Sequence, residues 1–188
     1  MKKTFKQELK SNRKIVITDG LVGGGKSLLA NLVSSLPNLD QWIHSSCFEQ
    51  ICALNYLGET SLNTSSSLIV KRHNETFWDN IILRNSNFRR SDDSSITNHI
   101  RYKKIFKRMK LADHKAYLKY KNKVNIQYMT HASSHFAEPL FKAFGKKLIF
   151  LSLLRSPLNI YILNHLSNWT DRWKKIKTRS SMITYYDH

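Results

Sequence analysis

Residues 20–27 have types and spacing that suit the binding of phosphate. They read Gly-Leu-Val-Gly-Gly-Gly-Lys-Ser, which is the pattern G-x-x-x-x-G-K-S. Glycines allow backbone N–H groups to turn inward around an anion, and a lysine adds a full positive charge. The apolar runs 14–18 and 28–33 on either side predict a strand before this loop and a helix after it, the order that such a cradle requires. The pattern therefore predicts that a phosphorylated compound is bound by Gly23, Gly24, Gly25, Lys26, Ser27 and Leu28.

The charge balance also points to anionic partners. The 31 Lys and Arg residues oppose 13 Asp and Glu residues, which gives a formal net charge of +18. Self-repulsion of this size destabilises a compact chain unless anions bind, so it favours nucleotides, anionic glycans, nucleic acid or an acidic membrane. Basic residues gather at 101–110, 115–123 and 172–177. A solvated helix face is an equally simple explanation of the first two clusters.

Three features bear on the location of the protein. Cys47 and Cys52 lie in an apolar helical stretch and are predicted to be buried thiols in a reducing compartment. Residues 4–14 are polar and charged where a secretory signal would be apolar. The longest apolar run, 148–154, is far shorter than a membrane span. We therefore expect a soluble, cytoplasmic protein without a membrane span.

The order of elements predicts an α/β fold, a P-loop parallel β-sheet flanked by helices with a mostly helical insertion. Helices between strands favour a parallel sheet, with the ligand at the carboxyl ends of the strands. The chain of 188 residues suits one domain, and the insertion spans about 61–123. The run 147–154 is continuously apolar and is predicted to be a buried central strand. Other expected strands are 41–44 and 125–130, and other expected helices run from Ser45 or Ser46 to Leu57 and over 136–144.

Transfer of a phosphoryl group from ATP requires a further feature that the sequence does not supply. The magnesium ion that bridges the phosphates needs a carboxylate at the end of a second strand. The run 147–154 continues instead into Arg155, and Asp19 stands on the strand of the loop itself. These residues disfavour a kinase of small metabolites, which stays open as an alternative. A basic nucleic-acid-binding protein is a second alternative, although no interleaved basic and aromatic signature supports it.

The segment around Arg155 resembles a known family. Leu-Arg-Ser-Pro at 154–157, after a strand and before the predicted helix 158–169, is similar to the second nucleotide signature of sulfotransferases that use 3′-phosphoadenosine 5′-phosphosulfate. The resemblance implies that Lys26 and the loop backbone hold the 5′-phosphosulfate and that Arg155 holds the 3′-phosphate. The family places a serine eight positions beyond this arginine, where this chain has Leu163. Asn159, on a nearby turn, is expected to substitute for it.

Thr130-His131, which lies 24 residues before Arg155, extends the resemblance. It is similar to the Thr-His segment of cytosolic sulfotransferases, which implies that His131 is the general base and that Lys26 stabilises the departing oxygen. His44 is a weaker candidate for the base. Because His131 closes a strand, we do not expect it to form a zinc pair with His135. Trp169, Trp173 and the segment 181–187 are also similar to the family pattern.

The resemblance implies sulfuryl transfer from 3′-phosphoadenosine 5′-phosphosulfate, as co-substrate, to a hydroxyl group. The acceptor is expected to be a glycan, anionic glycans included, or a small molecule, and nucleic acid is not an expected partner. In-line displacement through a charge-dispersed transition state depends on positioning and cationic stabilisation, so no metal is expected. The part of the family fold that closes over the adenine is expected to be missing from these 188 residues.

Overall fold

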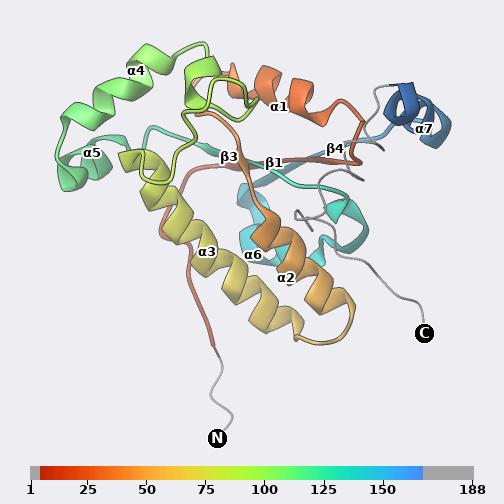
Figure 1. Ribbon diagram of the computed structural model, residues 1–188. Coiled ribbons are helices and arrows are strands. Elements are labelled where there is room, and N and C mark those ends of the chain that lie inside the picture. The colour runs from red at the N-terminus through yellow and green to blue at the C-terminus, as the bar shows by residue number, and fades with distance from the viewer. Residues whose placement is uncertain (1–4, 167–188) are drawn as a thin grey trace, which may run out of the picture.

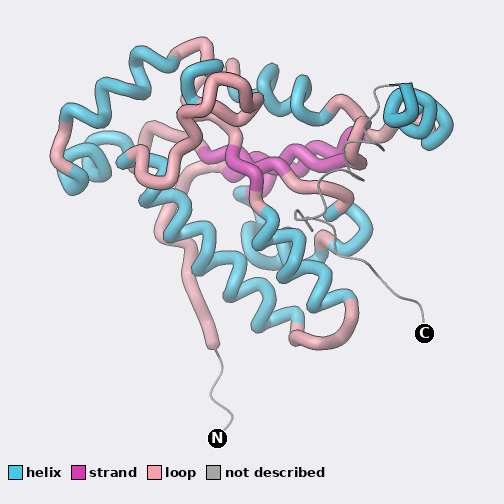
Figure 2. Tube along the Cα trace, in the orientation of Figure 1, coloured by secondary structure: helices cyan, strands magenta, loops and turns pink. Residues whose placement is uncertain are grey.

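A parallel sheet forms the centre of the protein. The computed structural model describes residues 5–166. Its strands are β1 (Ile15–Gly20), β2 (Ile43–His44), β3 (Ile126–Met129) and β4 (Leu148–Leu153), all parallel and in the order β2-β3-β1-β4. Figure 2 shows them as one layer between helices. The predicted class, an α/β fold with a parallel sheet flanked by helices, is confirmed. The segment 181–187 and both tryptophans noted above lie outside the described residues.

Side chains of β1 alternate between the two faces of the sheet, as the period of a strand requires. Ile15 and Ile17 belong to the main core, together with Phe48, Ile69 and Leu140 from three helices on one face. Those helices are α2 (Ser46–Tyr56), α3 (Leu62–Ile82) and α6 (Glu138–Phe144). Val16 points the other way and packs with Val33 of α1 (Lys26–Ser34). Figure 1 shows α1 on the face opposite α2, α3 and α6, so β1 is covered on both sides.

The segment 61–123 is helical and contains no strand, as predicted. After α3 it comprises η1 (Ile96–Asn98), α4 (Tyr102–Phe106), η2 (Lys107–Lys110) and α5 (Asp113–Tyr120). The Arg101 guanidinium joins this segment to the end of α1 and the loop that follows it, by donating to the carbonyls of Ser34, Ser35, Leu36 and Leu39. Arg108 forms a buried ion pair with Asp40, whose carboxylate also accepts a hydrogen bond from Asn80 of α3. These contacts fix the chain just before β2.

The remaining elements follow β3 and β4. They are η3 (Ser133–Phe136), η4 (Gly145–Lys147) and α7 (Pro157–Leu166). The predicted helix 136–144 is divided, because its first residue closes the 3₁₀ turn η3 and α6 begins only at Glu138. Pro139 stands in the first turn of α6, where its missing N–H costs nothing. In residues 5–166, no helix has both the length and the apolar character needed to cross a bilayer.

The position predicted for the apolar run 147–154 is wrong. β4 pairs with β1 but is the last strand of the sheet that residues 5–166 form, and Ile149 is 42% exposed. A continuous apolar run indicates how much surface a strand can bury, and it does not specify which strands become neighbours.

The prediction that both thiols are buried is confirmed for Cys52, whereas Cys47 is only half-buried. Burial raises the pKa of the Cys52 thiol to about 12.

Candidate functional site

The candidate site lies at the carboxyl edge of the sheet. Because all strands are parallel, residues that follow each strand reach the same edge. The loop 20–27 follows β1, His44 ends β2, His131 follows β3, and Arg155 follows β4. These four segments are far apart in the sequence, and the strand order brings them to one side of the molecule.

The glycine loop 20–27 adopts backbone angles that explain its composition. Gly23 and Gly25 have φ values of 81° and 92°, in the left-handed region that other residues rarely adopt. A Cβ atom on Gly20 would lie 2.9 Å from the carbonyl oxygen of Leu153, so only glycine allows β4 to approach. Gly25 is the N-cap of α1, and no side chain caps this helix. The first N–H groups of α1 therefore face the loop with the partial positive charge of a helix N-terminus.

Lys26 is nearly buried beneath this loop. Its Nζ donates to the carbonyl oxygen of Leu21 at 3.3 Å. Burial lowers the pKa of Lys26 to about 8, against the attraction of the Asp19 and Glu49 carboxylates. The ammonium group is thus poorly hydrated, and an anion in the loop would restore a favourable environment for it. Of the neighbouring residues assigned to the loop, Ser27 is half-buried and Leu28 is exposed.

Asp19 has a structural role that the sequence did not reveal. Its carboxylate is completely buried and accepts hydrogen bonds from Thr130 Oγ1 at 2.7 Å, from the Ser133 N–H at 2.9 Å and from the Ser134 N–H at 3.0 Å. The turn that it holds includes Ala132, which has a φ of 55°. A left-handed alanine is strained, so the turn depends on these hydrogen bonds. Asp19 therefore fixes the segment that carries His131 against the end of β1.

Three polar side chains converge beside this turn. His131 Nδ1 lies 3.0 Å from Glu49 Oε1 and 3.0 Å from His44 Nε2, and His44 Nε2 lies 3.4 Å from Glu49 Oε1. The backbone N–H of His131 also donates to Glu49 Oε1 at 2.7 Å. Burial by itself raises the pKa of Glu49, but the hydrogen bonds from His131 and His44 outweigh it and hold the pKa at about 2. The carboxylate is therefore ionised at any ordinary pH.

Sequence reasoning selected His131 and His44 and missed Glu49. One signal could have found it. Glu49 is the only acidic residue in 41–58 and stands in the first turn of α2. A helix that follows a parallel strand begins at the carboxyl edge of the sheet, so an acid in its first turn lies at that edge. His135, on η3, is exposed and does not belong to the cluster of His44, Glu49 and His131.

Arg155 and Asn159 lie at the same edge, on the side of β4. Leu153, the last residue of β4, pairs with Gly20, the first glycine of the loop. Arg155 follows this pair by two residues along the chain. Arg155 is exposed in the connection to α7, and Asn159 is exposed in the first turn of that helix. The side chain of Leu163 lies outside the described residues.

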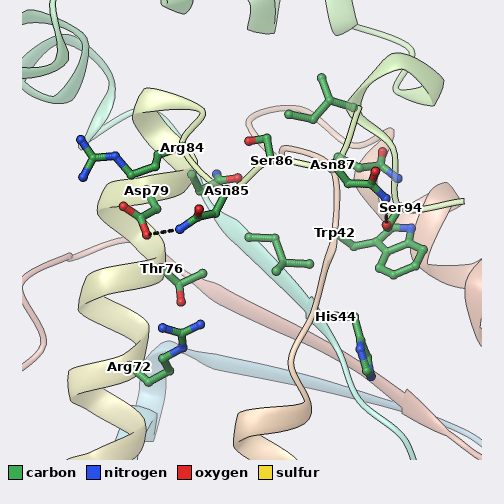
Figure 3. Close-up of a pocket in the computed structure, with 14 residues that line it drawn as sticks. Trp42, His44, Arg72, Thr76, Asp79, Arg84, Asn85, Ser86, Asn87 and Ser94 are labelled. Atoms are coloured by element: carbon green, nitrogen blue, oxygen red, sulfur yellow. Dashed lines mark hydrogen bonds between the residues drawn. The ribbon is translucent and has the colours of Figure 1, made fainter. Parts of the chain in front are cut away.

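A pocket of about 320 Å³ opens on the other side of the site, between β2 and α3. His44 forms one end of its wall (Figure 3). Arg72 and Thr76 of α3 face His44 and Trp42 across the opening, whereas the guanidinium of Arg84 points away from it and pairs with Asp113. The pocket therefore adjoins the His44–Glu49–His131 cluster and combines guanidinium, hydroxyl and amide groups.

Comparisons with protein-family models, with curated proteins and with solved structures found no match to this chain.

We expect Asp19→Asn to destabilise the fold. An amide retains one acceptor oxygen but turns an NH₂ group towards at least one of the three donors, so the free energy of unfolding should fall by about 2–4 kcal/mol. Urea denaturation followed by circular dichroism measures this change. Asp93→Asn, an exposed control with the same change in charge, should alter stability by less than about 0.5 kcal/mol. Equal effects of both substitutions would show that Asp19 does not hold the turn.

Proposed function

We propose that this protein is a sulfotransferase that moves a sulfuryl group from 3′-phosphoadenosine 5′-phosphosulfate to a hydroxyl group of a glycan or small-molecule acceptor. One observation carries the proposal, the position of Glu49. It hydrogen-bonds His131, and its charge also acts on Lys26. A histidine oriented as a base and a buried lysine in a glycine loop therefore share one site, which is the pairing that sulfuryl transfer to a hydroxyl group needs.

The donor is assigned to the glycine loop and the β4 side of the edge. The N–H groups at the start of α1 and the Lys26 ammonium would bind the 5′-phosphosulfate. Arg155, with Asn159 beside it, would bind the 3′-phosphate, and their exposure leaves both free to approach a ligand. Leu28 is exposed next to the loop and would contact the nucleotide.

The acceptor is assigned to the pocket between β2 and α3. Its polar wall suits a hydroxylated compound, and Arg72 would favour an acceptor with acidic groups. The pocket ends at His44, which contacts His131. An acceptor hydroxyl group at this end would lie between the pocket and the donor site.

The proposed step forms an acceptor oxygen to sulfur bond and breaks the bond between sulfur and the phosphate oxygen. Glu49 accepts a hydrogen bond from Nδ1 of His131, which leaves Nε2 as the basic nitrogen. Nε2 takes the proton of the acceptor hydroxyl, and Lys26 stabilises the negative charge that develops on the departing phosphate. The products are the sulfated acceptor and adenosine 3′,5′-bisphosphate.

The arrangement is less suited to a kinase. Thr130-His131 and Leu154-Arg155 follow the two strands that flank β1, so neither end offers a carboxylate for magnesium. Asp19 uses its carboxylate to hold the turn after β3. Metabolite kinase activity therefore has no specific observation in its favour.

The affinity for adenosine 3′,5′-bisphosphate should depend on the charge of Lys26. Because the pKa of Lys26 is about 8, its side chain carries a proton and a positive charge below that pH and loses both above it. The affinity should therefore fall by up to tenfold per pH unit as the pH rises above about 8. Lys26→Met should bind weakly at pH 7 and lose this dependence, whereas Lys142→Ala, an exposed control, should behave as the wild type. Calorimetric titration between pH 7 and 9.5 measures both. A flat wild-type profile would remove Lys26 from the anion site.

Arg155→Ala tests the assignment of the 3′-phosphate. It should weaken binding of adenosine 3′,5′-bisphosphate by about 1.5–3 kcal/mol, the value of a charge-assisted hydrogen bond, and leave adenosine 5′-monophosphate nearly unaffected. Arg90→Ala removes an exposed arginine elsewhere and serves as the control. Equal losses for both nucleotides would show that Arg155 does not recognise the 3′-phosphate.

His131→Ala tests the proposed base. The variant should still bind adenosine 3′,5′-bisphosphate but lose sulfuryl transfer by about a hundredfold or more, because general base catalysis typically contributes 10²–10⁴. The assay follows release of the bisphosphate with a panel of hydroxylated acceptors. His135→Ala, which changes an exposed histidine nearby, should retain activity. Wild-type activity in folded His131→Ala would contradict the assignment.

A further inference from the structure

The His44–Glu49–His131 cluster has the geometry of a metal site. Its three ligand atoms, His44 Nε2, Glu49 Oε1 and His131 Nδ1, form a triangle with sides of 3.0, 3.0 and 3.4 Å. A tetrahedral ion with bonds of about 2.0–2.1 Å places its ligand atoms about 3.3–3.4 Å apart, and an octahedral ion places them about 2.8–3.0 Å apart. The sides of the triangle lie in the range that these two geometries define.

The three pairs of atoms in this triangle cannot all be joined by hydrogen bonds. Each imidazole nitrogen either donates or accepts, and the carboxylate oxygen only accepts. If His131 Nδ1 carries the hydrogen, the lone pair of His44 Nε2 faces Glu49 Oε1. If His44 Nε2 carries it, the lone pair of His131 Nδ1 faces that oxygen, and if both do, two N–H groups face each other at 3.0 Å. A cation within the cluster would be attracted to all three atoms at once.

We propose that His44, Glu49 and His131 bind a divalent transition-metal ion, with zinc as the best match. Two imidazoles and one carboxylate form a donor set that zinc uses when it keeps a further position open. The side chains of His44 and His131 are 40% and 32% exposed, whereas that of Glu49 is 13% exposed. The ion would thus rest on a half-buried carboxylate, and its open position would face solvent or an incoming ligand.

The three ligands are held from separate elements. His44 ends β2, and Glu49 stands in the first turn of α2, just after it. His131 is held both by its own backbone N–H, which donates to Glu49, and by the turn that Asp19 anchors. The donor atoms are therefore placed by the fold before any ion binds, which reduces the ordering that binding requires.

The metal site is inferred from this geometry alone, whereas the effect of a bound ion on sulfuryl transfer rests on the proposed function. An ion bound to Nδ1 of His131 leaves the imidazole proton on Nε2, so this nitrogen can no longer accept the proton of a hydroxyl group. Zinc is therefore expected to inhibit sulfuryl transfer.

The test is calorimetric titration of zinc chloride into the full chain after treatment with a chelator. We expect binding at one site, and a loss of at least about a hundredfold in affinity in Glu49→Gln and in His44→Asn, since even an outer partner of a metal site contributes about 10- to 100-fold. His114→Ala, His135→Ala and Cys47→Ser are matched controls that remove other donors and should retain the wild-type affinity.

His44→Asn keeps the test decisive if Glu49→Gln fails to fold, because His44 is exposed and its loss leaves the core intact. Unchanged zinc affinity in folded His44→Asn, or no zinc binding by the wild type, would overturn the proposal. If zinc binds elsewhere in the chain, both variants should keep the wild-type zinc affinity, and this result would identify the other site. If zinc binds as expected but no donor nucleotide binds, the proposed function fails and the metal site stands.

Discussion

The site depends on the buried carboxylate of Asp19. It stands at the end of the central strand β1 and accepts three hydrogen bonds from residues 130–134. A buried charge is costly unless donors surround it, so these contacts are strongly favoured over any alternative arrangement of the turn. They compel Ala132 into its left-handed conformation and place His131 opposite Glu49. One carboxylate therefore couples the glycine loop to the histidine side of the site.

Local charges govern this site more than the net charge does. Lys26 is flanked by the carboxylates of Asp19 and Glu49, so the immediate surroundings of the loop are not strongly basic. The basic stretch 101–123 lies at the opposite end of the sheet, since Lys123 leads into the start of β3 while the glycine loop follows the end of β1. Screening over such a separation makes its contribution to the loop small. Under the proposed function, recognition of an anion therefore depends on the loop itself.

The helical segment 61–123 positions the edge strand β2. This strand has only two residues, and a short edge strand gains little from its own pairing. Asp40, just before it, is held by Arg108 and Asn80. Since His44 ends β2, these contacts also determine where His44 meets His131 and where the pocket beside α3 ends. The segment that looked like an insertion thus supports the site from a distance.

The sequence by itself determined the local elements. The glycine pattern predicted the loop, the apolar runs predicted the strands and the helices outside 61–123 to within a few residues, and helices between strands predicted a parallel sheet. These features follow from backbone angles and side-chain period, which neighbouring residues control. Only the tertiary structure decided the edge position of β4, the use of Asp19 as an anchor and the meeting of Glu49 with His44 and His131. Each of these joins residues distant in the chain, and their contacts depend on strand order, which local periodicity does not encode.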